Sequence, residues 1–145
     1  MKRLTIIAIL MAVCSLGMYA RGKKPIVFQD LPQAVQDSVL QNFTEAQIEF
    51  ITSKKVQFRT YEYKFIMLDN TQMEYDNKAR LHEIESPNGV PAAFIPQEIQ
   101  DYVQATFPNT LITKYERELL SQKVKLSNKM DLVFSKSGKF IRIDD

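Results

Sequence analysis

Two stretches of this chain, Leu31–Ile48 (LPQAVQDSVLQNFTEAQI) and Ile95–Ile112 (IPQEIQDYVQATFPNTLI), align without a gap at an offset of 64. Seven of the eighteen aligned positions are identical. The identities include polar residues, such as Gln33 with Gln97 and Asp37 with Asp101, so the match is not confined to apolar positions. This similarity indicates an internal repeat, which has to be recognised before a fold is assigned.

Each stretch predicts one amphipathic helix of about three turns, because its apolar residues recur at helical spacing. They are Leu31, Val35, Val39 and Phe43 in the first stretch and Ile95, Ile99, Val103 and Phe107 in the second. Pro32 and Pro96 are expected in the first turn, where a missing N–H is harmless. Pro108 is expected to end the second helix, because proline disfavours helical geometry in the residue before it.

After each predicted helix the chain shows short runs that alternate with period two and are separated by turn residues. The runs of the two copies align at an offset of 59, so the second copy has lost five residues in a loop between its first two strands. Tyr61, Tyr63, Phe65 and Met67 share one parity, which we expect the first helix to cover. The predicted strands are 47–54, 58–68, 71–76, 80–86, 111–119, 122–127, 130–135 and 139–144.

The predicted fold class is therefore α+β, with two tandem repeats of one helix plus a four-stranded antiparallel sheet and the helices packed on one face. The repeats span about residues 28–86 and 92–145 of a single domain, 21–145. The linker Ser86–Pro91 is rich in residues that interrupt regular structure. Because the linker is short, we expect the two repeats to pack together.

Residues 1–20 have the features of a signal peptide. Lys2 and Arg3 precede an apolar run from Leu4 to Val13, and small residues precede Ala20. The run is shorter than the roughly 20 apolar residues that a membrane span needs. Lipid attachment at Cys14 is an alternative that Met11 and Val13 fit poorly. We expect a periplasmic or secreted protein, cleaved near Ala20, with no membrane span in the mature chain.

The predicted mature chain carries no net formal charge. The whole chain has 19 basic and 17 acidic residues, and residues 1–20 contain two of the basic ones, so 17 remain on each side. No run of lysine and arginine exceeds two residues. Long-range attraction to nucleic acid or to anionic lipid, which requires a positive potential or a dense basic patch, is therefore not predicted.

The sequence offers little catalytic chemistry, and we expect no enzyme and no cofactor. His82 is the one histidine, and Cys14, the one cysteine, lies in the segment to be removed. A zinc site needs several such ligands. The turns Asp69-Asn70 and Asp76-Asn77 lack the spacing of a calcium loop. Carboxylate pairs involving Glu83, Glu116 or Glu118 leave a hydrolase as a remote alternative.

Both copies share a set of motifs: Leu31-Pro32, Phe43, Phe107-Pro108, Phe65 to Met67, Val124 to Leu126, and Phe134 to Phe140 with Gly138. These motifs resemble those of the PepSY-like proteins exported by Bacteroidetes, whose fold is related to that of the beta-lactamase inhibitor protein. The resemblance covers residues 28–145 and implies a tandem sheet of up to eight strands, with helices on one face and the other face open and concave. The related inhibitor clasps an enzyme with such a surface, although fold likeness alone is weak support for function.

The strand parity opposite to the predicted core mixes apolar and charged residues, a composition found in protein contact surfaces. The leading hypothesis is a non-catalytic binding or inhibitor-like protein that contacts a protein or peptide of the cell envelope through this face. The alternatives are a periplasmic small-ligand-binding or envelope-stress sensor protein, a dimer formed through the same face, and scattered surface residues without a role. The predicted partner-binding residues are Glu62, Lys64, Ile66, Glu74, Leu81, Lys125, Asp131, Val133, Phe140 and Arg142.

Overall fold

The structure is a computed structural model that describes residues 22–57 and 61–144. The predicted signal peptide and the beginning of the predicted strand 58–68 lie outside the described residues. Among the described residues, no helix is long and apolar enough to cross a membrane.

The described chain contains two α-helices and nine strands, with short 3-10 turns before and after the first helix and before the second. The first half comprises β1 (Lys23–Pro25), α2 (Gln33–Leu40), β2 (Ile48–Lys55), β3 (Tyr61–Met67), β4 (Gln72–Asp76) and β5 (Leu81–Glu85). The second half comprises α3 (Gln97–Thr106), β6 (Ile112–Arg117), β7 (Ser121–Leu126), β8 (Asp131–Ser135) and β9 (Phe140–Asp144).

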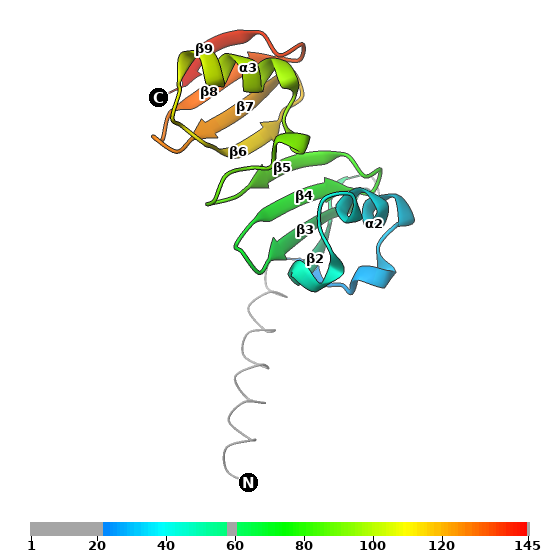
Figure 1. Cartoon of the computed structure of the whole chain (residues 1–145). Helices are drawn as coiled ribbons and strands as arrows, with labels where there is room; N and C mark the ends of the chain where they lie inside the picture. The colour runs from blue at the N-terminus through cyan, green and yellow to red at the C-terminus, as the bar shows by residue number, and fades with distance from the viewer. Residues whose placement is uncertain (1–21, 58–60, 145) are drawn as a thin grey trace.

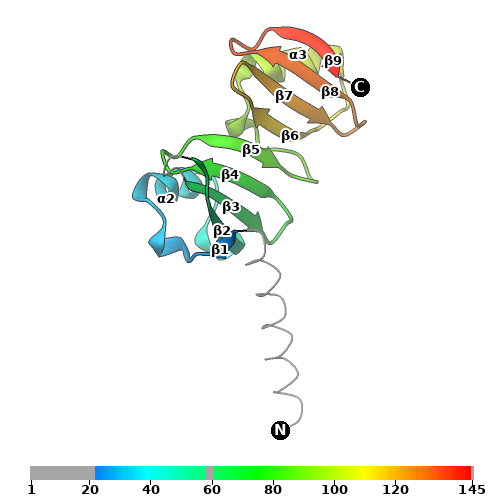
Figure 2. The same ribbon diagram turned by 180° about the vertical axis from the view of Figure 1, so that it is seen from behind.

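All nine strands form one antiparallel sheet, in which the order in space is the order in sequence. Figure 1 shows α2 over the first half and α3 over the second half, both on the viewer's side of the sheet. In Figure 2, from behind, the strands lie in front of both helices. The prediction of an α+β fold with helices on one face is confirmed, and the strands of the two halves join in a single sheet.

The polar identities of the repeated stretch have a structural explanation. Gln36 Nε2 donates a 2.9 Å hydrogen bond to the carbonyl oxygen of Leu31, and Gln100 Nε2 donates a 2.7 Å bond to that of Ile95. Gln33 likewise bonds to Asp37 one helical turn later, as Gln97 does to Asp101. Pro32 and Pro96 occupy the N-cap positions, one residue before the first turn in which they were predicted. The identical residues thus fix the entry into each helix.

The hydrophobic core lies between the helices and the covered face of the sheet. Val35 and Val39 of α2 are fully buried, as is Ile99 of α3, while 4 % of Val103 is exposed. Burying a side chain of this size stabilises the fold by about 1.5 to 3 kcal/mol relative to leaving it in water. The strand residues that line the covered face include Phe65, Met73, Tyr75, Tyr115, Val124, Leu132 and Phe134.

Corresponding strands of the two halves pair in the same register. In the first half Phe65 lies opposite Met73, and in the second half Val124 lies opposite Leu132, which are the positions that the sequence repeat aligns with them. Both halves also contain a β-bulge at the same place in their last hairpin. His82 of β5 and Ile141 of β9 have no partner residue on the adjacent strand, because the pairing register shifts by one residue at each of them. Such an extra residue reverses the face on which the following side chains lie.

The seam between the halves is the short pairing of β5 with β6. Three residue pairs join these strands, compared with four between β4 and β5 and five between β6 and β7. The predicted linker extends the contact, because the backbone N–H groups of Ser86 and Val90 donate 2.8 Å hydrogen bonds to the carbonyls of Thr113 and Ile112. The two halves therefore share one backbone hydrogen-bond network, as expected from the short linker.

Strands β2 to β9 begin and end within three residues of their predicted limits. Strand β1 was not predicted, because Lys23-Lys24-Pro25 has no apolar alternation and contains a proline. Tyr61, predicted to be covered by the first helix, is 41 % exposed, whereas Tyr63, Phe65 and Met67 are buried as predicted.

Candidate functional site

The uncovered face of the sheet, here named the open face, carries continuous rows of side chains that cross both halves. Neighbouring strands place Lys64 beside Glu74, Glu74 beside Glu83, and Glu83 beside Glu116. The same row continues from Glu116 through Lys123 and Val133 to Arg142. Of the ten predicted partner-binding residues, strand parity places eight on this face: Glu62, Lys64, Ile66, Glu74, Lys125, Asp131, Val133 and Arg142.

Ion pairs link most charged residues of the open face. Lys64 lies 3.2 Å from Glu74, with each side chain about one quarter exposed. Lys114 lies 3.0 Å from Glu83 and 3.7 Å from Glu116, and so connects the two halves across the seam. Partial burial acts to lower the pKa of Lys114, but the hydrogen bond and the charge of Glu83, helped by Glu116, raise it overall. The face is therefore charged yet locally neutralised.

A second cluster of ion pairs covers the open face of the last strands. Lys123 lies 3.2 Å from Asp144 and 3.5 Å from Asp131, and Arg142 lies 3.2 Å from Asp144. The hydrogen bond from Lys123 lowers the pKa of Asp144 and raises that of Lys123. A hollow of about 90 Å³ between Lys114, Glu116, Lys123, Lys125 and Asp131 marks this part of the face.

Apolar residues are few on the open face. Ile66 is half-buried and lies opposite Phe50 of β2, and Val133 is buried with 3 % exposed. Neither Phe50 nor Lys114 was among the predicted site residues, because the period-two pattern was not extended to β2 and β6. A register irregularity also precedes each of them, between Ile48 and Phe50 and between Ile112 and Lys114, so alternation counted from the start of either strand would have placed them on the covered face.

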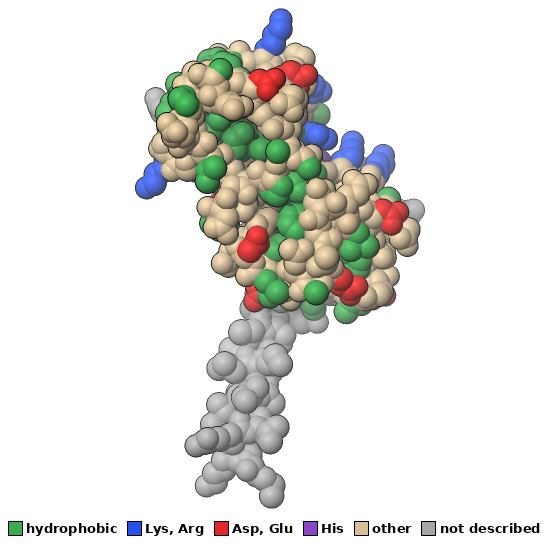
Figure 3. Space-filling view, in the orientation of Figure 1, with side chains coloured by type: hydrophobic (Ala, Val, Ile, Leu, Met, Phe, Trp, Pro, Cys, Tyr) green, Lys and Arg blue, Asp and Glu red, His purple; other side chains and the backbone are tan. Residues whose placement is uncertain are grey.

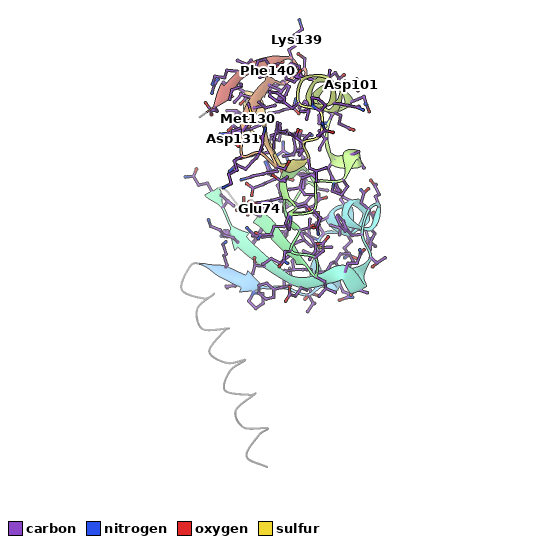
Figure 4. All side chains as sticks on the ribbon, turned by 60° about the vertical axis from the view of Figure 1, so that its left-hand side comes forward. Glu74, Asp101, Met130, Asp131, Lys139 and Phe140 are labelled. Atoms are coloured by element: carbon purple, nitrogen blue, oxygen red, sulfur yellow. The ribbon has the colours of Figure 1, made fainter. Side chains whose placement is uncertain are left out.

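Leu81 and Phe140 were wrongly assigned to the open face. Leu81 lies opposite Tyr75 and packs against the covered core. Phe140 stacks on Tyr102 of α3, with ring centroids 4.7 Å apart and planes 11° apart. Figure 4 shows Phe140 near α3, apart from Glu74 and Asp131. The bulges at His82 and Ile141 cause the error, because an alternation counted through an extra residue changes face.

His82 lies on the bulge of β5, with its Nε2 3.4 Å from Asp76 Oδ2. Asp76 also accepts hydrogen bonds from the backbone N–H groups of Lys78 and Arg80 and from the Arg80 guanidinium, so it is occupied in holding its own turn. Within the described ranges, no three His, Cys, Asp or Glu side chains lie close enough together to hold a metal ion.

Two clefts of about 630 Å³ open on the surface. One lies between β1 with its following turn and the beginning of β2. The other lies at the seam between the halves, where it is lined by Arg80, His82, Pro96, Arg117, Leu119 and Lys136 among others. A ligand sensor was expected to have a deep apolar pocket; this cleft is open, and four of the nine residues that line it, Arg80, Arg117, Glu118 and Lys136, are charged.

The fold has solved counterparts. A "putative calcium-regulated periplasmic protein" from Bacteroides thetaiotaomicron is 31% identical, with a TM-score of 0.79, and the match covers 87% of this chain and 99% of that one. A "putative periplasmic protein from DUF2874 family" from Bacteroides vulgatus ATCC 8482 is 28% identical, with a TM-score of 0.76 and coverage of 85% and 97%. A "putative periplasmic protein of unknown function" from the same organism is 27% identical, with a TM-score of 0.77 and coverage of 86% and 100%.

The search of curated proteins gives no match. The sequence model of one family matches residues 18–65 and 61–142, which together cover most of the chain. This family is described as "putative beta-lactamase-inhibitor-like, PepSY-like". With its helices on one face of an antiparallel sheet and its periplasmic structural neighbours, the chain belongs to the PepSY-like family.

Proposed function

We propose that this chain is an exported, non-catalytic binding protein whose open face contacts a protein or peptide of the cell envelope. The observation that carries the proposal is the open face itself. It extends without interruption over both halves, and α2 and α3 lie on the opposite side of the sheet. Neighbours described as putative periplasmic proteins support export. Removal of the signal peptide near Ala20 is part of the proposal and rests on the sequence pattern of residues 1–20.

The composition of the open face supports a polar contact rather than an apolar one. Its ion pairs hold charged side chains in fixed positions before a partner arrives, which lowers the entropy lost on binding. Ile66 and Phe50 offer an apolar patch within this charged surface. A partner with complementary charges would be selected mainly by its electrostatic pattern. The two halves, as copies of one unit, would present related halves of one surface.

The proposal is tested with a variant that carries Ile66→Glu and Lys125→Glu. A partner is first captured by cross-linking in envelope extracts and identified, and its affinity is then measured with purified components. We expect the variant to lose at least about tenfold in affinity, as for residues near an interface centre. The control carries Leu40→Glu and Lys129→Glu, which likewise replace one aliphatic residue and one lysine by glutamate, but outside the open face. Equal affinity for the variant and the wild type would refute the role of the open face.

A second candidate function is the binding of a small ligand between the halves. The observation that favours it is the seam cleft of about 630 Å³, a size that suits a small molecule. Arg117→Gln together with Lys136→Gln would weaken the binding of such a ligand and leave the affinity of a partner for the open face unchanged. The two functions are thus separated by two sets of substitutions.

A further inference from the structure

One end of the sheet collects four hairpin tips, which begin at positions 56, 77, 118 and 136. Because the strands alternate in direction, the turns after β2, β4, β6 and β8 lie at the same end. Strand β1 also begins there, since Lys23 pairs with Lys54 near the end of β2. We name this region the hairpin-tip end.

The hairpin-tip end is strongly basic. The four tips contribute Lys55, Lys78, Arg117 and Lys136, each in the turn or in the last residue of the strand before it. Five more cations lie beside them: Lys23, Lys24, Lys54, Arg80 and Lys139. Figure 3 shows basic side chains along the right-hand edge of the molecule, and Figure 4 shows Lys139 extending away from the fold.

Acidic residues do not balance this charge locally. Within the described turns and the two strand residues on either side, the nine cations face four acidic residues, Glu62, Asp76, Glu116 and Glu118. At the opposite end of β2 to β9, the same count gives two cations, Lys125 and Lys129, and five acidic residues, Glu49, Asp69, Glu85, Asp131 and Asp144. The formal charges are therefore 9 − 4 = +5 and 2 − 5 = −3, so a nearly neutral protein has a basic end and an acidic end.

Three of the four acidic residues of the hairpin-tip end are already engaged. Asp76 is buried and bonded to Arg80, Glu116 lies near Lys114, and Glu118 accepts a hydrogen bond from Ser121. Among the described side chains, Arg80 is the one of the nine cations that forms an ion pair. The remaining cations are available to an external anion.

Two apolar side chains protrude from the same end. Leu119 and Leu120 form the turn between β6 and β7 and are 83 % and 77 % exposed, more than any other large apolar residue described. Two adjacent leucines at a convex tip cannot bury each other, and exposed apolar surface of this kind indicates an interaction site. At the same end of the sheet, beyond the β4–β5 tip, Val56 and Tyr61 are each 41 % exposed.

The seam cleft brings the charged and apolar groups together. Its lining includes Arg80 from the β4–β5 tip, Arg117 and Leu119 from the β6–β7 tip, and Lys136 from the β8–β9 tip. Its volume of about 630 Å³ is sufficient for a phosphate-bearing headgroup. Guanidinium and ammonium groups are the side chains that bind phosphate oxygens.

We propose that the β6–β7 tip and the seam cleft beside it dock on an anionic phospholipid surface. Leu119 and Leu120 enter the interfacial layer, while Arg117 and Lys136, which form no ion pair among the described side chains, bind headgroup phosphates. Charge complementarity favours an anionic occupant, and the protruding shape favours a bilayer, which accepts a convex apolar tip without a preformed pocket. This surface lies at the end of the strands rather than on the open face, so the inference does not depend on the proposed function.

The test uses the protein purified from cells that express the whole chain, mixed with vesicles of phosphatidylglycerol and phosphatidylcholine or of phosphatidylcholine alone. Bound protein is measured by co-sedimentation. We expect binding to the anionic vesicles that falls as salt rises. Arg117→Gln with Lys136→Gln should weaken it about 25-fold, since each cation near an anionic membrane contributes about fivefold. Leu119→Ser with Leu120→Ser should weaken it at least about tenfold.

Matched controls test whether the position of the removed side chains matters, and not only their chemical type. Lys125→Gln with Lys129→Gln removes two cations from the opposite end, and Leu40→Ser with Leu111→Ser removes two exposed leucines elsewhere. Both controls should bind within about twofold of the wild type. Equal binding to both vesicle types, or unchanged binding by the tip variants, would overturn the proposal. Binding to soluble polyglutamate but not to vesicles would also overturn it and indicate an acidic protein as the partner.

Discussion

The last hairpins of the two halves follow the same backbone path with different polar chemistry. In the first half, the Arg80 N–H donates a 2.9 Å hydrogen bond to the Asp76 carboxylate. In the second half, the Lys139 N–H donates a 3.1 Å bond to the Ser135 hydroxyl, at the corresponding position. The backbone bonds that close the two turns also correspond, including the 3.1 and 3.0 Å bonds that the N–H groups of Ala79 and Gly138 donate to the strand-end carbonyls. A carboxylate in the first half and a hydroxyl in the second thus accept the corresponding backbone hydrogen bond of their turns.

This comparison shows which features the fold requires. Both halves keep a positive φ at the same turn position, 60° at Ala79 and 82° at Gly138, and both keep the bulge that follows. The identity of the hydrogen-bond acceptor is free to change. Exchanging residues between corresponding positions therefore tests how far the two halves are equivalent.

The largest effect is expected from Asp76→Ser, which gives the first half the acceptor of the second. Asp76 is 3 % exposed and accepts bonds from the Arg80 guanidinium and two backbone N–H groups. Serine can replace one of these bonds, so we expect the free energy of unfolding at pH 7 to fall by about 3 kcal/mol. Chemical denaturation of the variant and the wild type would measure this fall in the free energy of unfolding. A loss below about 1 kcal/mol would show that the hydroxyl is an equal substitute.

The same variant predicts a change in pH dependence. Burial acts to raise the pKa of Asp76, but hydrogen bonds from the backbone and side chain of Arg80 and from Lys78 leave it below its ordinary value of 3.8. A carboxyl whose pKa is lowered on folding stabilises the protein above its unfolded pKa and loses this contribution as the pH falls through the folded value. Stability of the wild type relative to Asp76→Ser should therefore decrease below about pH 4, while a constant difference there would contradict the assignment.

The next effect concerns the positive φ of the turn. Gly138→Ala should lower the free energy of unfolding by about 2 kcal/mol, because alanine is strained in this conformation. In addition, the Cβ of the alanine would lie 2.9 Å from the Cβ of Glu98. Ala79→Gly should instead stabilise by about 0.5 to 1 kcal/mol, because glycine adopts this conformation without strain. Thermal unfolding of each variant, compared with the wild type, measures the two changes in stability. Changes of the same sign would show that the two turns are not equivalent.

The smallest effect is expected from Tyr75→Phe, which introduces the residue found at the corresponding position, Phe134. Tyr75 is 1 % exposed, and its hydroxyl finds no hydrogen-bond partner of good geometry among the described residues. Burial raises the pKa of Tyr75, and Ser38 of α2 acts in the opposite direction. Removing an unsatisfied buried hydroxyl should raise the free energy of unfolding by up to about 1 kcal/mol in denaturant titrations. A loss of stability would show that Ser38 satisfies the hydroxyl.

Much of the fold follows from the sequence. The repeat of Leu31–Ile48 in Ile95–Ile112 predicted both helices, and period-two alternation predicted β2 to β9. Eight predicted partner-binding residues lie on the open face for the same reason. Leu81 and Phe140 do not, because a bulge adds one residue and leaves no mark in the alternation pattern. The bulges at His82 and Ile141 are visible only once the strands are paired.

The basic hairpin-tip end was also hidden in the sequence. No run of cations exceeds two residues, and the predicted mature chain is formally neutral, so charge counting argued against anionic surfaces. The sheet assembles the cations because each second turn returns to the same end. Arg80, Arg117 and Lys136, which are far apart in the sequence, thereby line one cleft. Net charge is a property of composition, whereas a charged surface is a property of topology.

The two outer strands of the sheet have unequal consequences for assembly. β1 is three residues long and carries two lysines and Pro25, features that discourage another strand from joining it. β9 is five residues long, pairs on one side among the described strands, and exposes Ile141 and Ile143. A strand of another chain that added to this sheet would therefore join at β9. Two copies could associate in this way once, but growth into a fibre, which needs two receptive edges, would stop there.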